Sequence, residues 1–284
     1  MSGVTNIDPT EAKDKLSRLA ELVKGKYSRD RLDRGKIPQE TDLHFYTRYL
    51  ASKQWDINKA FKQIVEMLDW RQRSNVDAIS QLSADEVLCG QEGIENKVLQ
   101  CFPIFGLPRS KETVLDVRQN NWTGLVPSSG IIRDSIGRLV FCYKVGALNL
   151  DALLSHVDEE IFMKYTIWRF ERMVELLGET VESKTEAEKR ILLFDLEGFS
   201  MSKHAKRKVV NVIKDFNSLG ASCYRETVSK IVIINTPKLF SVAWSMVRPF
   251  VNPQTRKKIV MGNGKGDEKV LEYVEISKQL PSLP

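Results

Sequence analysis

The chain has 284 residues and a formal net charge of +6, so it can bury a sizeable core and favours anionic partners. The charge alone fits acidic phospholipid head groups and nucleic acid equally. The sequence shows no secretory signal and no run of about 20 apolar residues, which predicts a soluble protein that meets membranes only peripherally. Four cysteines lack the spacing of a zinc site or a disulfide framework, so reduced cytosolic thiols are expected at Cys89, Cys101, Cys142 and Cys223.

The first 95 residues predict a lobe of three or four helices. Asp8 suits an N-cap with Pro9 at the first helical position, and apolar residues follow at helical spacing as far as Val23. A second helix fits residues 42–53. Asp56 caps a third helix, whose apolar stripe ends near Trp70. We therefore expect an N-terminal helical lobe over residues 1–95.

From about residue 96 the pattern changes to strands that alternate with helices. We expect residues 98–108 to be extended and rich in turns, and residues 131–145 to form two strands around a turn at 134–137. A helix, a strand, a helix and a strand follow at residues 158–177, 191–198, 203–219 and 231–235. Because a strand–helix–strand order requires a crossover and gives parallel pairing, residues 96–284 are expected to form an α/β lobe.

A helix expected at residues 239–250 is unusually apolar. Its polar residues form one narrow stripe, and apolar residues cover the rest of its surface; the stripe is Ser241, Ser245 and Arg248. Two apolar faces fit either an interior core helix or a mobile gate that covers a lipid cavity and meets a membrane. Periodicity alone favours the core helix, because it does not distinguish a protein partner from a lipid partner.

No catalytic or nucleotide-binding motif is present. The DxxG at residues 195–198 and the glycines at 262–266 lack the spacing of a phosphate-binding loop or a dinucleotide site, so both are expected to form tight turns. His44, His156 and His204 lack metal-ligand spacing, and no GxSxG elbow occurs. We therefore expect no enzyme, no metal and no cofactor, although a discontinuous triad would escape this reasoning.

Basic residues cluster at residues 203–208 and 256–258. Such clusters are usually solvated faces. Their functional interpretation is contact with anionic lipid, which contributes about 1 kcal/mol per residue near the surface. Nucleic acid is a weaker candidate because the sequence has no RNP-type strand and no recognition-helix signature.

In order and spacing, several segments resemble the CRAL-TRIO lipid-binding family, most closely its phosphatidylinositol/phosphatidylcholine transfer branch. The resemblance covers roughly residues 40–284 and rests on YLASKQWDINKA (49–60) leading to DWR (69–71), GRLVFCYKVGALNL (137–150), LLFDLEGFS (192–200) and KIVIINTPKLFSVAWSMVRPFVNPQTRKKI (230–259). It implies an α/β fold in which a helical lobe packs on a mixed, mainly parallel sheet with an apolar lipid cavity. It also makes the 239–250 helix the gate of that cavity, through Leu239, Phe240, Val242, Ala243, Trp244, Met246, Val247 and Phe250.

The function that the resemblance implies is not catalytic. A protein of this kind extracts one phospholipid from a membrane, shields its acyl chains, and exchanges or presents it. The resemblance further implies a cytoplasmic protein that associates peripherally with anionic intracellular membranes, binds no nucleic acid, and has lipid kinases or other membrane-trafficking proteins as candidate partners. The alternatives are an interaction module for a protein partner, a carrier of a sterol, tocopherol or retinoid-like molecule, and an enzyme.

The resemblance assigns a phosphoinositide-type head group to four residues, which are Lys53, Glu226, Thr255 and Lys258. Lysines are cationic donors, threonine is a neutral donor and glutamate is an acceptor, a set that suits a phosphate and sugar hydroxyls. Without a lipid, a surface ion pair would explain Glu226, and solvation of a helix end would explain Thr255 and Lys258.

Four positions depart from the family pattern. Arg190 and Leu192 stand where the branch has a Ser-x-Thr pair that enters the strand. Leu192 cannot donate to a phosphate, whereas Arg190 either donates or projects into solvent. Phe141 and Phe170 stand where the branch has tyrosines associated with choline lipids, which keeps the apolar surface and removes two hydroxyls. We therefore expect Arg190 among the head-group residues, and Phe141, Phe170 and Leu192 along the cavity.

Overall fold

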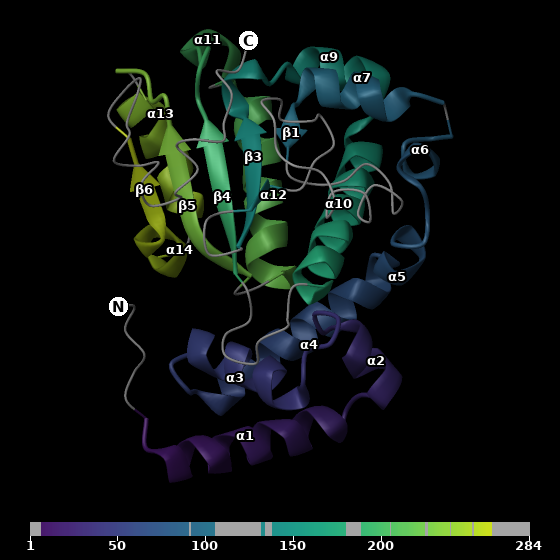
Figure 1. The fold of residues 1–284 in the computed structure, drawn as a ribbon, viewed down its shortest axis with the longest axis vertical. Helices are drawn as coiled ribbons and strands as arrows, with labels where there is room; N and C mark the ends of the chain where they lie inside the picture. The colour runs from purple at the N-terminus through teal and green to yellow at the C-terminus, as the bar shows by residue number, and fades with distance from the viewer. Residues whose placement is uncertain are drawn as a thin grey trace.

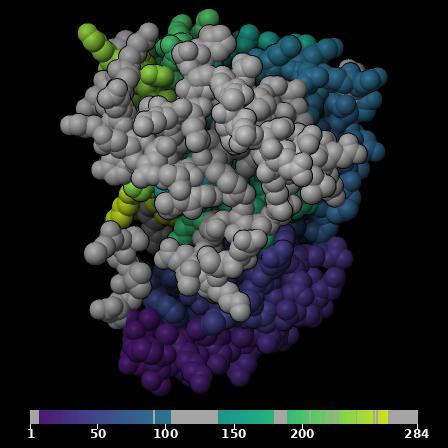
Figure 2. All heavy atoms as spheres, viewed as in Figure 1, coloured from purple at the N-terminus to yellow at the C-terminus, as the bar shows by residue number. Residues whose placement is uncertain are grey.

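The computed structural model describes residues 7–90, 92–105, 132–133, 138–179, 189–204, 206–224, 227–238, 240–251 and 253–262. Figure 1 shows helices α1 (Pro9–Lys24) to α4 (Ile57–Arg73) at one end of the molecule and a sheet with its covering helices at the other. In Figure 2 the same N-terminal helices, in purple, form the lower part of the surface. The chain therefore has the helical part and the α/β part that the change of pattern predicts.

Capping side chains set the starts of the predicted N-terminal helices. The Asp8 carboxylate accepts hydrogen bonds from the backbone N–H groups of Thr10 and Glu11 at the start of α1. Thr41 and Asp56 cap α3 (Asp42–Ser52) and α4 in the same way. These helices bury a core of their own, which includes Leu19, Val23, Phe45, Leu50, Ile64 and Leu68. The three predicted helices are confirmed.

Three further helices in this region have no counterpart among the predicted elements. They are α2 (Arg29–Arg34), α5 (Val76–Ile79) and α6 (Ala84–Val87). Each has at most six residues, fewer than two turns, so it cannot show a repeating apolar stripe.

Residues 98–101 are helical, which corrects the expectation that residues 98–108 are extended. They belong to α7 (Ile94–Cys101), in which Ile94, Val98 and Cys101 are buried at helical spacing. The helix ends at Cys101, and Phe102 is not helical because Pro103 disfavours the helical conformation of the residue before it. A stripe of three buried residues is too short to distinguish from an apolar strand in the sequence.

A mixed, mainly parallel sheet forms the centre of the α/β part, as predicted. Its strands are β1 (Ile104–Phe105), β2 (Ile132–Arg133), β3 (Leu139–Lys144), β4 (Arg190–Asp195), β5 (Val228–Ile234) and β6 (Ile259–Met261). Their order is β1-β3-β4-β5-β6, and β2 also pairs with β3. Strands β3 to β6 run parallel, whereas β1 and β2 are antiparallel to β3. The predicted turn at residues 134–137 lies outside the described residues.

Alternate residues of each strand point to opposite faces of the sheet. One face carries a small core made of Val140, Cys142, Ile191, Leu193 and Val232. The other face belongs to the main core, together with helices α10 (Glu159–Glu179) and α12 (Arg207–Cys223), and presents Phe141, Tyr143, Leu192, Ile231 and Ile233. A side chain on this second face is therefore enclosed between the sheet and two long helices.

The connection from β4 to β5 is the predicted crossover, with one difference. Residues 203–219 belong to two helices, α11 (Met201–His204) and α12, instead of one. Lys206 separates them because its backbone is extended, with φ −62° and ψ 142°. Two elements lie between β3 and α10: η1 (Val145–Ala147) and α9 (Leu150–His156).

A largely buried ion-pair network joins the helical part to the α/β part. Arg71 of α4 donates two hydrogen bonds, of 2.9 and 3.0 Å, to the carboxylate of Glu171 in α10. The Tyr224 hydroxyl donates to the same carboxylate at 2.7 Å, and Arg71 also donates to Asp77 at 3.1 Å. The rings of Trp70 and Tyr224 lie 6.0 Å apart beside this network. The exact position of the predicted lobe boundary stays a prediction.

Candidate functional site

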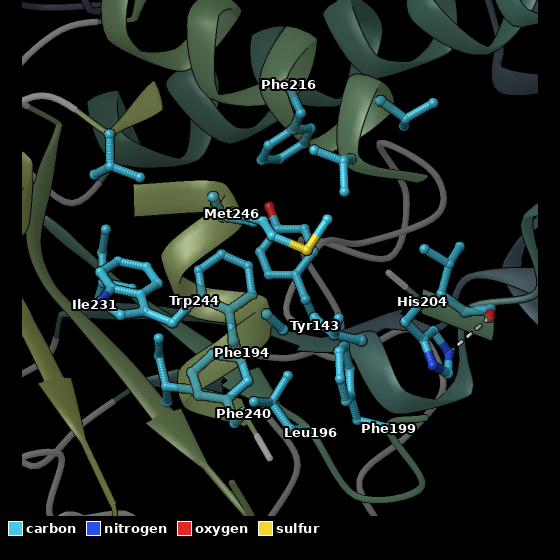
Figure 3. Close-up of a pocket in the computed structure, with 18 of the residues that line it drawn as sticks. Tyr143, Phe194, Leu196, Phe199, His204, Phe216, Ile231, Phe240, Trp244 and Met246 are labelled. Atoms are coloured by element: carbon cyan, nitrogen blue, oxygen red, sulfur yellow. Dashed lines mark hydrogen bonds between the residues drawn. The ribbon is translucent and has the colours of Figure 1, made fainter. Parts of the chain in front are cut away.

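An apolar cavity of about 170 Å³ lies between the sheet and helices α12 and α13 (Phe240–Val247). Figure 3 shows aromatic rings from three sides converging on it: Tyr143 and Phe194 from the sheet, Phe216 from α12, and Phe240 and Trp244 from α13. Aliphatic side chains fill the spaces between these rings. The space is therefore suited to hydrocarbon and poorly suited to a polar ligand.

The floor of the cavity follows from strand alternation. Tyr143, Phe194 and Ile233 are paired in register across β3, β4 and β5, so their side chains form one row on the enclosed face. The rings of Tyr143 and Phe194 lie 5.2 Å apart. Phe141 and Leu192, expected along the cavity, are also paired in register but lie one row nearer the amino ends of the strands, where both are buried and neither lines this cavity.

One imidazole lines the cavity, at the carboxyl end of the strands. His204 Nδ1 accepts a hydrogen bond from the Ser200 N–H at 2.9 Å, and its Nε2 lies 3.1 Å from the Leu148 carbonyl oxygen. These contacts fit a neutral imidazole that donates from Nε2. Both ring nitrogens are therefore engaged by backbone groups, as in a histidine that belongs to a packed core.

Helix α13 forms one wall of the cavity and lies at the molecular surface. Phe240, Ala243, Trp244 and Val247 follow helical spacing and line the cavity. On the outer side, Val242 of the helix is 51% exposed, and Phe250, just beyond the end of the helix, is 46% exposed. Ala243 is the single buried residue among those described in α13, so the core-helix interpretation that periodicity favours is wrong and the helix has two different apolar faces.

The expected helix over residues 239–250 is shorter in the structure. It ends at Val247, and a 3₁₀ turn, η2 (Arg248–Phe250), follows. Pro249 explains the change, since it removes a backbone donor and disfavours the α conformation of Arg248. Leu239, predicted at the start of the gate, lies outside the described residues.

The cavity is smaller than a phospholipid requires. Drug-sized ligands occupy pockets of roughly 300–1,000 Å³, whereas a cavity of about 150 Å³ holds one benzene molecule. At about 170 Å³ the space beneath α13 is close in volume to a cavity that holds one benzene molecule. Two acyl chains fit only if part of its wall moves outward.

The predicted head-group residues lie in two parts of the molecule. Thr255, in α14 (Pro253–Lys257), lines the cavity, and its carbonyl accepts a hydrogen bond of 3.0 Å from the Lys258 N–H. The Lys258 ammonium donates to the Val228 carbonyl at 2.9 Å. Lys53 is half-buried at the end of α3 in the helical part. Glu226 lies outside the described residues, so its role stays a prediction.

Arg190 is buried, which corrects the alternative that it projects into solvent. It is 2% exposed, and its Cζ lies 5.9 Å from the ring centre of Phe141 and 5.6 Å from that of Phe170. Burial lowers the pKa of the Arg190 guanidinium to about 10, so the group remains charged at neutral pH. In the sheet Arg190 pairs with Val228, whose carbonyl accepts from Lys258, so Arg190 and Lys258 share the amino end of the strands.

The sequence patterns miss several residues of the cavity. Tyr143 follows from alternation, since it lies two residues beyond Phe141 on the same strand face. Phe216 and His204 lie on helices whose inward faces are predictable, but nothing in a helical pattern indicates empty space behind them. In the part of the chain that the structure describes, acidic, histidine and cysteine side chains form no group that could hold a metal ion. None of the described helices is both long enough and apolar enough to cross a bilayer.

Comparison with known proteins gives a consistent result. The CRAL/TRIO domain family model matches residues 125–282, more than half of the chain. A CRAL-TRIO domain-containing protein of Caenorhabditis elegans is 25% identical over 263 residues, which cover 91% of this chain and 31% of the relative. The phosphatidylinositol/phosphatidylcholine transfer protein SFH7 of Arabidopsis thaliana is 24% identical over 244 residues, 85% of this chain and 39% of the relative.

A solved structure agrees at the level of the fold. The crystal structure of Sfh5 superposes with a TM-score of 0.59 at 15% identity, and the match covers 95% of this chain and 85% of that structure. The chain spans about a third of the length of the curated relatives described above. The structural likeness shows the fold, and the family model accounts for more than half of the sequence: this protein belongs to the CRAL/TRIO domain family, among relatives of the phosphatidylinositol/phosphatidylcholine transfer branch.

Proposed function

We propose that this protein takes one lipid from a membrane into the cavity beneath α13 and exchanges or presents it. The observation that carries the proposal is the cavity itself, an apolar interior whose outer wall is a short helix with a second apolar face toward solvent. The similarity to SFH7, which is named as a phosphatidylinositol/phosphatidylcholine transfer protein, supports lipid transfer as the activity.

The energetics of burial favour such a role. Each CH₂ group removed from water contributes about 0.8 kcal/mol, so an apolar cavity can compete with the bilayer for an acyl chain. The cavity must enlarge to admit a lipid, and α13 is the wall best suited to move. Of its described residues only Ala243 is buried, so displacing this helix disrupts less packing than displacing α12 or the sheet.

For the head group, we propose a phosphoinositide type held by Thr255 and Lys258, with Glu226 and Lys53 as further contacts. The position of Thr255 in the cavity lining and its backbone hydrogen bond to Lys258 support the first two. Exposed basic residues at the start of α12 support peripheral association with anionic membranes on the cytoplasmic side. Lipid kinases or other membrane-trafficking proteins are the corresponding candidate partners.

A smaller hydrophobic ligand is the second candidate. The cavity volume of about 170 Å³ favours it, because a sterol, tocopherol or retinoid-like molecule requires less enlargement than a phospholipid with two chains. A ligand of this class would contact the same apolar lining, and Thr255 and Lys258 would then have no phosphate to bind.

Native mass spectrometry and lipid extraction of the purified protein test both candidates. We expect one bound lipid per chain, and we expect the protein to move labelled phosphatidylinositol between vesicles. An Ala243→Phe variant should reduce transfer at least about fivefold, because the larger side chain fills the space that the lipid needs. A protein that carries no lipid and moves none would contradict the proposal.

A substitution on the outer face of the same helix serves as the control. Val242→Phe adds the same ring on the exposed side of α13, where it does not reach the cavity. It should leave the amount of bound lipid unchanged. Equal loss of bound lipid in both variants would indicate damage to the helix and would count against a role for the cavity.

A further inference from the structure

A second, smaller chamber lies beside the main cavity. Its volume is about 20 Å³, enough for one or two water molecules, and four residues line both spaces: Phe102, Tyr143, Phe162 and Phe216. Its remaining described lining comes from α10, through Tyr165, Thr166, Arg169, Phe170 and Met173. The inner end of an otherwise apolar interior therefore contains a guanidinium group.

Arg169 is buried in the chamber wall with part of its hydrogen-bonding capacity unused. Its Nη1 donates to the Tyr165 hydroxyl at 2.9 Å, and that hydroxyl donates to Glu95 at 2.7 Å. Its Nη2 is buried and has no hydrogen-bond partner among the residues described. The nearest described carboxylate therefore reaches this cation only through a tyrosine.

Arg190 is a second buried cation, and it lies behind one of the rings of the chamber wall. Its guanidinium lies 5.6 Å from the ring of Phe170, which lines the chamber. Within the described residues, its Nε and Nη1 make no hydrogen bond. Both Arg169 and Arg190 lower the pKa of Tyr143, against the larger opposing effect of burial, so both charges act on one hydroxyl at the boundary of the two spaces.

Another buried arginine on α10 shows the usual arrangement. Arg172 donates from Nη2 to the Glu175 carboxylate at 2.7 Å and to the Ser80 carbonyl at 2.5 Å. It is as buried as Arg169, at 8% exposure, but it has a counter-ion. A buried charge is normally paired, since an unpaired one is costly. Among the described residues, no carboxylate contacts Arg169 or Arg190 directly, so a negatively charged counter-ion is missing.

We propose that Arg169 and Arg190 form an oxyanion subsite that holds the phosphate or carboxylate of an amphiphile, with its apolar tail in the space beneath α13. The inference rests on the proposed binding of a lipid in the cavity, and it gives the anionic head group a position different from that at Thr255 and Lys258. The ligand enters by displacing the ring of Phe216, which lines both spaces. It brings the missing negative charge, and guanidinium groups are well matched to oxyanions.

The same geometry disfavours a quaternary ammonium head group at this place. Aromatic faces attract cations, but the faces of Phe141 and Phe170 already have the Arg190 guanidinium over them. A choline group would meet a like charge there, whereas a phosphate monoester or a carboxylate meets an opposite one. The ligand class is therefore an amphiphile whose head ends in an anion.

The test measures binding of matched probes to the delipidated 284-residue chain by calorimetry. The probes are oleate against oleyl alcohol, 1-oleoyl lysophosphatidate against 1-oleoyl glycerol, and inorganic phosphate alone. We expect each anionic lipid to bind at least about tenfold more tightly than its neutral partner, and phosphate to bind at least about a hundredfold more weakly than lysophosphatidate. Phosphate that binds as tightly as lysophosphatidate would show a site for the free ion and overturn the lipid assignment.

Arginine variants show which side chains cause the preference for anionic over neutral probes. In Arg190→Met and in Arg169→Met the anionic and neutral probes should bind within about threefold of each other, whereas Arg190→Lys should retain part of the preference. Arg172→Met is the matched control, because it removes a buried arginine of α10 that has its own counter-ion, and it should keep the full tenfold preference. An anion preference that survives in both methionine variants of the subsite would refute the proposal.

Thermal unfolding gives an independent readout that separates binding from misfolding. Replacing an uncompensated buried charge by a hydrophobic side chain is often neutral or stabilising, so lipid-free Arg190→Met should melt at the wild-type temperature or up to about 5 °C above it. Oleate should raise the melting temperature of the wild type more than that of Arg190→Met, whereas oleyl alcohol should shift both by a similar amount. Neutral probes that bind without any anion preference would leave lipid transfer intact and reject the subsite, whereas no binding by any probe would reject both.

Discussion

Two buried tyrosines show how much a single hydroxyl contributes in this protein. Tyr224 donates to the Glu171 carboxylate at 2.7 Å, inside the network that joins the two parts of the molecule. The hydroxyl of Tyr46, in α3, is equally buried but has no partner within the described residues. The aromatic rings are comparable in both cases, so the difference between them isolates the hydrogen bond.

We expect Tyr224→Phe to lower the free energy of unfolding by about 1.5–3 kcal/mol, the range for a hydrogen bond to a charged group. Burial, and then Glu171, raise the pKa of Tyr224 well above 10. The neutral hydroxyl therefore contributes its stability at neutral pH, and the contribution is lost as the pH rises above about 10. Urea unfolding at pH 7 and at pH 10.5 measures both effects.

Tyr46→Phe is the matched control for this prediction. Burial raises the pKa of Tyr46 to about 12, and its unpartnered hydroxyl contributes nothing to compensate for its desolvation. Removal of that oxygen should leave stability unchanged or increase it by up to about 1 kcal/mol. An equal loss in both variants would mean that the ring packing, and not the hydrogen bond, determines the effect.

At the level of elements, α13 combines a lining face with an exposed apolar face. Val242 of α13 and Phe250 of the following turn η2 are exposed and do not line the cavity. A cation lies beside Phe250, since Lys214 Nζ of α12 is 5.1 Å from its ring. Apolar side chains next to lysine suit insertion into the head-group region of an anionic bilayer.

We expect Val242→Ser combined with Phe250→Ser to weaken binding to vesicles of phosphatidylcholine and phosphatidylserine at least about tenfold, because two apolar side chains no longer leave water. Since both residues are exposed, the melting temperature should change little. Vesicle co-sedimentation measures the binding. Leu43→Ser, at a site that is 57% exposed on α3, should bind as the wild type does. Unchanged binding of the double variant would remove α13 from the membrane contact.

The sequence predicts elements whose signals are local. Asp8 and Asp56 identify helix starts by their side chains, and the alternating residues of β3 identify its enclosed face. The helical conformation of α7 and the break between α11 and α12 at Lys206 depend on tertiary packing, so the local sequence pattern does not predict them. The same distinction holds for the site. Periodicity predicts the apolar residues from Phe240 to Val247, whereas the burial of Arg190 and the empty space behind α12 depend on tertiary contacts.

For the whole molecule, the contact between the two parts depends on a close approach at Gly178. A Cβ atom on this residue of α10 would lie 2.6 Å from the Pro38 Cβ and 2.7 Å from the Pro38 carbonyl oxygen. Pro38 belongs to the helical part. Any side chain at position 178 therefore separates the helical part from α10.

We expect Gly178→Ala to lower stability by about 1–3 kcal/mol, as overpacking does in a dense interior, and to weaken the cooperativity between the two parts. Gly220→Ala in α12 is the control, because its new Cβ would lie an ordinary 3.6 Å from Phe170 Cζ. That variant should gain about 0.5–1 kcal/mol from higher helix propensity. Denaturant unfolding followed by both fluorescence and circular dichroism measures the difference. If Gly178→Ala is as stable as the wild type and unfolds in one cooperative transition, the contact between Gly178 and Pro38 accommodates the added Cβ atom and the prediction is wrong.

The aromatic contacts at the junction continue into the interior of the α/β part. Trp70 of the helical part lies 6.0 Å from Tyr224, Tyr224 stacks on Phe170 at 4.7 Å, and Phe170 lies 5.6 Å from Arg190. Three rings and one guanidinium thus form a continuous row of contacts, which begins where the helical part meets the α/β part and ends at Arg190 in the interior of the α/β part. If Arg190 belongs to the proposed oxyanion subsite, ligand choice and the assembly of the two parts share these side chains, and a change of ring size at Phe170 should alter both properties together.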